Sequence, residues 1–102
     1  MESKLQEKCM KLAKVNNILA RKIHSEGRRG WPDLVLIFPM TAVTVWVEMK
    51  NPNGKGRVSK LQNAEIRRIR GQGGIVYICN SYETFLKILD NHVSPKTRIY
   101  EI

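Results

Sequence analysis

Two short apolar segments, each with a carboxylate at one end, most constrain the fold of this chain. The first reads GWPDLVLIF over residues 30–38, and the second reads VTVWVEMK over residues 43–50. β-Branched and aromatic residues dominate both segments, and Pro39 ends the first. Both are therefore predicted to be strands, at 34–38 and 43–49, that pair as a hairpin.

The rest of the chain predicts helices and strands around this hairpin. Apolar residues recur at helical spacing near the start of the chain, and Ser59 and Gln62 have the spacing of a helix capping box. The expected elements are a helix over about 2–21, a strand around 22–25, the two strands of the hairpin, a helix from 59 to about 70, a strand over 75–79, a helix from 80 or 81 to about 89, and an optional edge strand over 98–102. At 102 residues, the chain is expected to form one α/β domain over 1–102.

The charge of the chain indicates a polyanionic partner. Lys and Arg number 18 against 9 Asp and Glu, which gives a net charge of +9. No run of about 18 apolar residues and no signal-like start supports a membrane, so nucleic acid is the expected partner. Cys9 and Cys79 lack a close-paired metal spacing and are expected to be reduced core thiols of a cytoplasmic protein. His24 and His92 are expected to be structural or exposed.

The acidic residues at the ends of the two strands suggest catalysis. Successive side chains of a strand point to opposite faces, so Glu48 and Lys50 share a face, and Asp33 comes beside Glu48 if the hairpin forms. Two carboxylates at a strand end can bind Mg²⁺ or Mn²⁺, and Lys50 could orient a nucleophile or stabilise a phosphoryl transition state. The alternative is that Asp33 is a turn residue and that Glu48 and Lys50 only pair on an exposed sheet.

A family resemblance favours the catalytic interpretation. GWPD at 30–33, EMK at 48–50 and the helical Gln62 resemble the G-x-P-D, E-x-K and Q series of the virus-type replication-repair nuclease (VRR-NUC) family. The resemblance spans nearly the whole chain, as in a stand-alone member of the kind found in phages. It implies the PD-(D/E)xK superfamily and its restriction-endonuclease-like fold, a central mixed sheet flanked by helices in three layers. It also implies an Mg²⁺- or Mn²⁺-dependent, structure-selective DNA nuclease, similar to Holliday-junction resolvases.

The resemblance also implies a role for each matching residue. Asp33 and Glu48 would be metal ligands, Lys50 the catalytic lysine and Gln62 the helix glutamine. Gln62 has a second interpretation, because at the third position of its helix it could simply bond back to Ser59.

The family pattern further includes a glutamate on the first helix, for which Glu2 and Glu7 are the candidates. Glu2 shares the apolar stripe of Leu5 and Cys9, whereas Glu7 falls on the opposite, lysine-rich face. Glu2 is therefore the favoured residue, although it lies at the frayed start of the chain.

Basic residues flank the expected metal site and are candidates for binding the DNA backbone. They are Arg28, Arg29, Lys55, Arg57 and Lys60. Such contacts supply affinity without reading sequence, as suits an enzyme that recognises branched DNA by its shape. Trp31 and Trp46 are expected mainly to pack, although Trp46 shares the face of Glu48 and could line the site or a dimer contact.

A non-catalytic, basic nucleic-acid-binding protein is the alternative from another functional class. It explains the charge, but it does not explain two carboxylates converging with a lysine, since acids repel DNA unless a cation bridges them. By analogy with junction-resolving enzymes we expect a homodimer, located in the host-cell cytoplasm if the chain is phage-encoded.

Overall fold

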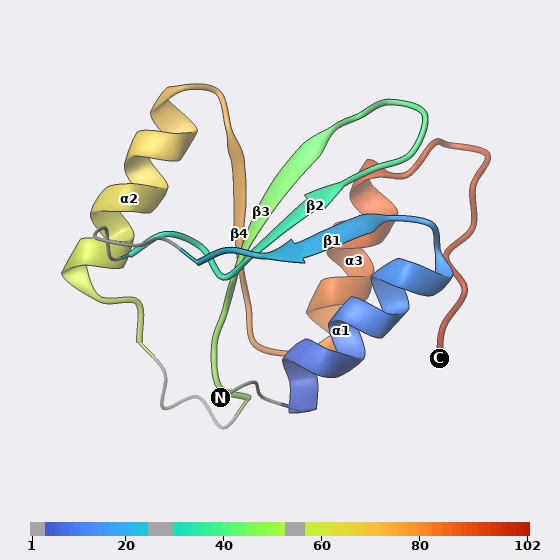
Figure 1. Cartoon of the computed structure of the whole chain (residues 1–102), viewed down its shortest axis with the longest axis horizontal. Coiled ribbons are helices and arrows are strands. Elements are labelled where there is room, and N and C mark those ends of the chain that lie inside the picture. Colours follow the sequence, from blue (N-terminus) through green and yellow to red (C-terminus); the bar gives the residue numbers. More distant parts are fainter. Residues whose placement is uncertain (1–3, 25–29, 53–56) are drawn as a thin grey trace.

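A computed structural model describes residues 4–24, 30–52 and 57–102 of the chain. Its elements in chain order are α1 (Lys4–Val15), β1 (Leu19–Lys22), β2 (Leu34–Ile37), β3 (Thr44–Met49), α2 (Lys60–Gly71), β4 (Ile75–Cys79) and α3 (Tyr82–His92). Figure 1 shows their arrangement. The order of helices and strands predicted from the sequence is confirmed.

The strands form one mixed sheet in the order β1-β2-β3-β4. β1 pairs with β2 and β2 with β3 in antiparallel register, whereas β3 and β4 run parallel and are connected through α2. The predicted hairpin is therefore confirmed as the β2–β3 pair, with Leu34 opposite Val47 and Ile37 opposite Thr44.

The helices cover the two faces of this sheet unequally. α1 and α3 pack against each other on the face of Val45 and Val47, where the buried core also includes Cys9 and Phe85. α2 lies on the opposite face, and its main contacts are with β4 (Figure 1). The result is the α/β, restriction-endonuclease-like architecture expected from the sequence, with a central mixed sheet between helices.

The first helix ends earlier than predicted. It stops at Val15 rather than near Arg21, because Asn17 takes a left-handed conformation (φ 60°) and the Ile18 amide donates a hydrogen bond to the Ala13 carbonyl at 2.9 Å. The next residues pair with β2, so the strand expected around 22–25 lies at Leu19–Lys22.

The end of the chain also differs from the expectation. Residues 98–102 form no strand. Instead, the side chain of Asn16 takes the place of a strand partner, since its Oδ1 accepts from the Tyr100 amide at 2.7 Å and its Nδ2 donates to the Tyr100 carbonyl at 2.9 Å. α3 is capped by Ser81, whose hydroxyl accepts from the Thr84 amide at 3.1 Å, and it extends to His92 rather than Leu89.

Other expectations concern membrane contact, the cysteines and the histidines. Of the helices in the described ranges, none has the length and apolar character needed to cross a membrane. Cys9 and Cys79 are free and buried, as expected of core thiols. His92 is partly buried beside Tyr77, and His24 is exposed.

Candidate active site

A glycine places the GWPD segment against α2. Gly30 has φ +93°, and a Cβ atom there would lie 2.9 Å from the Leu61 carbonyl oxygen. Only glycine accommodates both the left-handed backbone and this close approach without strain. The loop that leads into β2 therefore packs on the first turn of α2, which brings Asp33 and Gln62 towards the same end of the sheet.

The β2–β3 pairing sets the two acidic residues side by side. Leu34 faces Val47, so the next position outward places Asp33 opposite Glu48. Oδ2 of Asp33 accepts a hydrogen bond from the Met49 amide at 2.8 Å, which fixes the carboxylate at the strand end. Glu48 is only 2% exposed, on the face opposite to Val47, as strand alternation predicts.

Lys50 and Gln62 both contact the carboxylate of Glu48. Oε2 of Glu48 lies 3.2 Å from the Lys50 ammonium and accepts a hydrogen bond from Nε2 of Gln62 at 2.5 Å. The Lys50 ammonium also donates to Oε1 of Gln62 at 2.8 Å, so the three side chains form a closed group. The Lys50 amide donates to the Cys79 carbonyl at 2.8 Å, which ties the backbone of this position to β4.

Gln62 satisfies both interpretations of its place in the sequence. Its amide donates to the Ser59 hydroxyl at 3.1 Å, and its Oε1 accepts from the Ser59 amide at 2.9 Å, so the capping box is formed. The same Oε1 accepts from Lys50, because a carbonyl oxygen has two lone pairs. The start of α2 and the carboxylate group are thus joined through one side chain.

The electrostatics of Glu48 are those of a buried acid near a second acid. Burial raises the pKa of Glu48, and the negative charge of Asp33 raises it further, to about 7, against the opposing effect of Lys50. Oε1 of Glu48 is buried and has no hydrogen-bond partner in the described part of the chain. An ionised Glu48 would therefore gain from a cation at this oxygen.

These features fit a magnesium or manganese ion. Two adjacent carboxylates, one with an unpartnered buried oxygen, are the hard oxygen donors that such ions prefer. Within residues 4–24, 30–52 and 57–102, no group of three or more His, Cys, Asp or Glu side chains comes together to hold a metal. A set of two carboxylates is nevertheless usual for Mg²⁺, which keeps several water or substrate oxygens as ligands.

Comparison with known proteins identifies the family. A family model described as the VRR-NUC domain matches residues 2–83. The chain belongs to the VRR-NUC family. A solved structure titled VRR_NUC domain superimposes with a TM-score of 0.75 at 28% sequence identity, covering 86% of this chain and 92% of that chain. No curated protein sequence matches. Membership indicates a nuclease, and the resemblance inferred from GWPD, EMK and Gln62 is confirmed.

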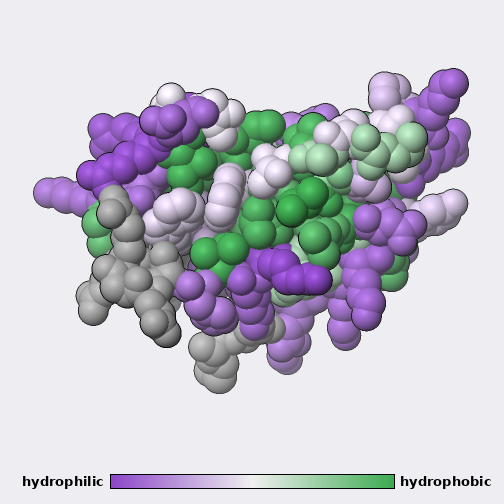
Figure 2. All heavy atoms as spheres, turned by 45° about the horizontal axis from the view of Figure 1, so that its top comes forward, coloured by the Kyte–Doolittle hydropathy of each residue, from purple (hydrophilic) through white to green (hydrophobic). Residues whose placement is uncertain are grey.

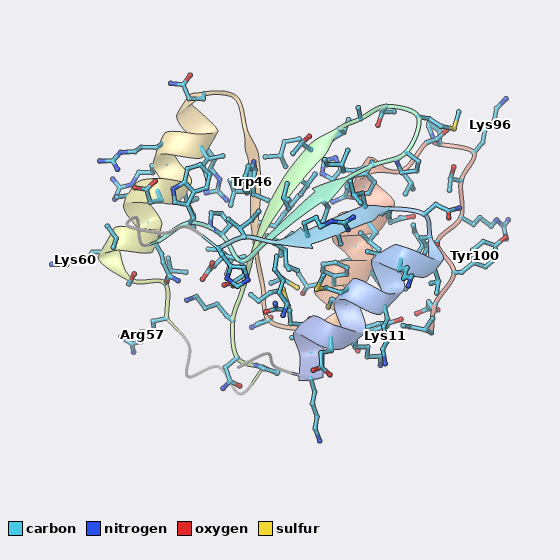
Figure 3. The ribbon with its side chains drawn as sticks, in the orientation of Figure 1. Lys11, Trp46, Arg57, Lys60, Lys96 and Tyr100 are labelled. Carbon is cyan, nitrogen blue, oxygen red and sulfur yellow. The ribbon has the colours of Figure 1, made fainter. Side chains whose placement is uncertain are left out.

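The remaining candidate residues, the helix glutamates and the basic residues that flank the site, lie partly outside what the structure describes. Glu2, Arg28, Arg29 and Lys55 lie outside the described residues. The rival helix glutamate, Glu7, is exposed in the first turn of α1. Figure 3 shows Arg57 and Lys60, both exposed, near the start of α2. The structure therefore brings together Asp33, Glu48, Lys50 and Gln62.

A cavity that was not predicted from the sequence lies beside this VRR-NUC site. It has a volume of about 520 Å³ and is lined by Trp31, Trp46, Glu65, Arg68, Ile69, Gln72 and Gly74. The two indole rings make an edge-to-face contact, with centroids 5.3 Å apart. Glu65 is buried and bonded to Arg68. The feature of the sequence that could have indicated this cavity is the helical spacing of Gln62, Glu65 and Ile69, which places them on one face of α2.

Proposed function

We propose that this VRR-NUC chain is an Mg²⁺- or Mn²⁺-dependent deoxyribonuclease that hydrolyses phosphodiester bonds in branched DNA, such as Holliday junctions or flaps. The observation that carries the proposal is the buried Oε1 of Glu48, which lies beside Asp33 and Lys50 and has no hydrogen-bond partner among residues 4–24, 30–52 and 57–102. A surface that only binds phosphate has no use for such a carboxylate, because it repels DNA unless a cation intervenes.

Asp33 and Glu48 would hold the metal ion. When bound, such an ion lowers the pKa of a coordinated water and neutralises charge on the scissile phosphate. The Met49 amide fixes the Asp33 carboxylate, and Gln62 fixes that of Glu48. Both acids are thus held in place before substrate arrives, so little reorganisation is needed during the reaction.

Lys50 supplies the positive charge of the site. Its ammonium group has three donors, and the hydrogen bond to Gln62 and the ion pair with Glu48 hold it in place. The group can orient the attacking water or donate to a phosphate oxygen as negative charge develops in the transition state. Gln62 acts through the other two side chains and is a positioning residue.

Cleavage and metal binding test this function together. The protein is incubated with labelled single-stranded, flap, splayed and four-way DNA and with matched linear duplex, in Mg²⁺, in Mn²⁺ and in EDTA. Asp33→Asn should abolish cleavage and weaken metal binding in calorimetry. The control is Asp90→Asn, which removes an exposed acid of α3 and should change neither. DNA binding that is indifferent to metal, with no substrate cut, would instead support a non-catalytic binding protein.

We also propose that the enzyme acts as a homodimer. Two apolar side chains on the edge strands, Leu19 on β1 and Ile78 on β4, are 44% and 43% exposed. By strand register both lie on the Glu48 face, which α2 covers mainly at β4. Figure 2 shows apolar side chains gathered in the middle of one view of the surface, bordered by hydrophilic ones. Sedimentation giving only a monomer at micromolar concentration, with and without DNA, would contradict this.

A further inference from the structure

Three segments that carry residues of the proposed active site also line the cavity of Trp31 and Trp46. Trp46 precedes Glu48 by two positions in β3 and shares its face, at a separation of roughly 6.6 Å along the strand. Trp31 precedes Asp33 by two positions, and Glu65 follows Gln62 by one turn of α2. Figure 3 places Trp46 between α2 and the sheet. The cavity and the proposed active site are therefore built from the same three segments, on the Glu48 face of the sheet.

The walls of the cavity are flat and mostly apolar. The indole rings of Trp31 and Trp46 are both half-buried and meet at an interplanar angle of 61°, so each ring presents surface to the cavity. Arg68, whose side chain is 63% exposed, bonds through Nη1 to Oε1 of the buried Glu65 at 2.7 Å, which restrains its guanidinium plane. Aromatic rings and guanidinium planes are the surfaces on which unstacked nucleobases are bound.

The volume and charge of the cavity also suit a nucleotide. A volume of about 520 Å³ lies within the range of roughly 300–1,000 Å³ that is common for small-ligand sites. α2 also exposes Arg67 and Arg70 beside Arg68, in a chain of net charge +9, so a phosphodiester backbone is attracted to this helix. An apolar peptide would gain nothing from these cations.

We propose that this cavity receives the base of an unpaired nucleotide adjacent to the scissile phosphate. The inference rests on the proposed nuclease function and narrows its substrate. A base inside a duplex is stacked on both sides and cannot reach Trp31 and Trp46 without being extruded. The preferred substrate is therefore DNA that already has an unpaired nucleotide at the point of cleavage, such as a flap or a splayed end.

Intrinsic fluorescence tests the site independently of cleavage. The chain has two tryptophans, and both line the cavity. Splayed DNA is titrated in EDTA against the same DNA carrying an abasic residue at the branch point, with anisotropy recording total binding. The intact base should quench the fluorescence and bind about 5- to 150-fold more tightly than the abasic DNA, as expected for stacking of one base.

Two neighbouring arginines provide a matched pair of variants. Arg68→Ala should reduce the preference for the intact base, because it removes one wall of the cavity. Arg67→Ala removes the same charge from an exposed residue that does not line the cavity, and it should weaken binding of both DNAs equally.

The outcomes separate this site from the nuclease function. If the parent protein cuts branched DNA in Mg²⁺ but binds intact and abasic DNA alike, without differential quenching, the base site is wrong and the nuclease function stands. If the protein neither binds nor cuts any of these DNAs, both are wrong. If Arg67→Ala and Arg68→Ala reduce the preference for the intact base equally, the cavity does not bind the base.

Discussion

Lys50 combines two tasks that can be separated by substitution. Its ammonium group neutralises part of the charge on Glu48, and in the proposed mechanism it also contacts the reacting phosphate. Its side chain is 14% exposed, and its backbone amide anchors the strand end independently of the side chain. A change at this side chain therefore affects the chemistry of the site more than the fold.

Lys50→Ala should fold and bind divalent metal but cut DNA about 10²- to 10³-fold more slowly, the usual effect of losing one preorganised transition-state contact. DNA affinity should fall little, because one cation among many supplies only a share of the phosphate attraction. Lys87→Ala, which removes the same charge from an exposed position of α3, is the control and should cut normally. Parental cleavage by Lys50→Ala in saturating Mg²⁺ or Mn²⁺ would exclude the catalytic role.

The proximity of Asp33, Glu48 and Lys50 could be predicted because it depends on short-range geometry. Strand alternation and a hairpin register suffice to set these side chains together. The contact of Gln62 with Glu48 could only be suggested, because it depends on how α2 docks on the sheet. That docking depends on contacts between residues far apart in the chain, such as those of α2 with β4 and the approach of Gly30 to Leu61, for which no local pattern exists.

At the scale of the element, the first turn of α2 contributes both to helix stability and to the proposed active site. The first turn is closed by the reciprocal bonds of Ser59 and Gln62, and Gln62 also reaches Glu48 and Lys50. Loss of the helix cap should therefore affect stability, whereas loss of the contact with Glu48 and Lys50 should affect cleavage, although both changes lie in the same turn.

Ser59→Ala should cost about 1 kcal/mol of stability, as removal of a capping hydroxyl does, and should leave the cleavage rate of the folded protein unchanged. Gln62→Ala should lower cleavage by about 10- to 100-fold, the usual effect of losing a residue that orients a metal ligand. Denaturant unfolding measures the stability of each variant, and cleavage rates are compared at a temperature at which both variants are folded. Equal loss of cleavage in both would mean that only the helix start matters.

The end of α3 provides a pH-dependent contribution to stability. His92 lies against Phe38 and Tyr77, and its Nε2 is 2.7 Å from the Tyr77 hydroxyl. Burial lowers the pKa of His92 from its ordinary value of 6.5, so the unfolded chain takes up this proton at a higher pH than the folded chain. The contribution is complete above pH 6.5 and is lost as the pH falls through the lowered pKa.

Urea unfolding of the parent protein and of His92→Gln at pH 8 and at acidic pH should therefore show that the variant is favoured relative to the parent as the pH falls, because the effect of the raised pKa of Glu48, which runs in the opposite direction, is common to both. The matched control is His24→Gln, since His24 is exposed, and it should retain the pH dependence of the parent. If His24→Gln and His92→Gln behave identically, the contact with Tyr77 does not provide the effect.

The boundaries of the elements were less predictable than their order. Leu19 continues the apolar spacing of α1 and so extended the predicted helix, yet it is an exposed residue of β1. Pairing with β2 overrides the local helical pattern once Asn17 has turned the chain. A distant contact also overrides the local strand pattern of residues 98–102. There, the backbone of Tyr100 bonds to the side chain of Asn16, which lies 84 positions earlier in the chain.

At the scale of the whole molecule, the core extends beyond the region that the family model matches. That match ends at residue 83, whereas α3 contributes Phe85, Ile88 and Leu89 to the buried cluster that includes Cys9 and Leu12 of α1. α1 and α3 thus support one face of the sheet, which leaves the other face to the proposed active site and α2.

Net charge is the other property of the whole molecule, and it predicts how DNA binding responds to salt. Each phosphate contact that is lost should flatten the log–log dependence of affinity on salt by about 0.9 on duplex DNA. Arg28→Ala, Arg29→Ala, Lys55→Ala and Arg57→Ala should each do so and should weaken binding to all sequences alike, because phosphate contacts carry no sequence information.

Lys96→Ala is the control, since Figure 3 shows Lys96 at the opposite end of the molecule from Arg57. Titrations at several salt concentrations with the metal removed keep cleavage out of the measurement. A slope that stays at the parental value in all four variants would show that these basic residues do not contact the DNA backbone, and the charge of the chain would then have to act through its other cations.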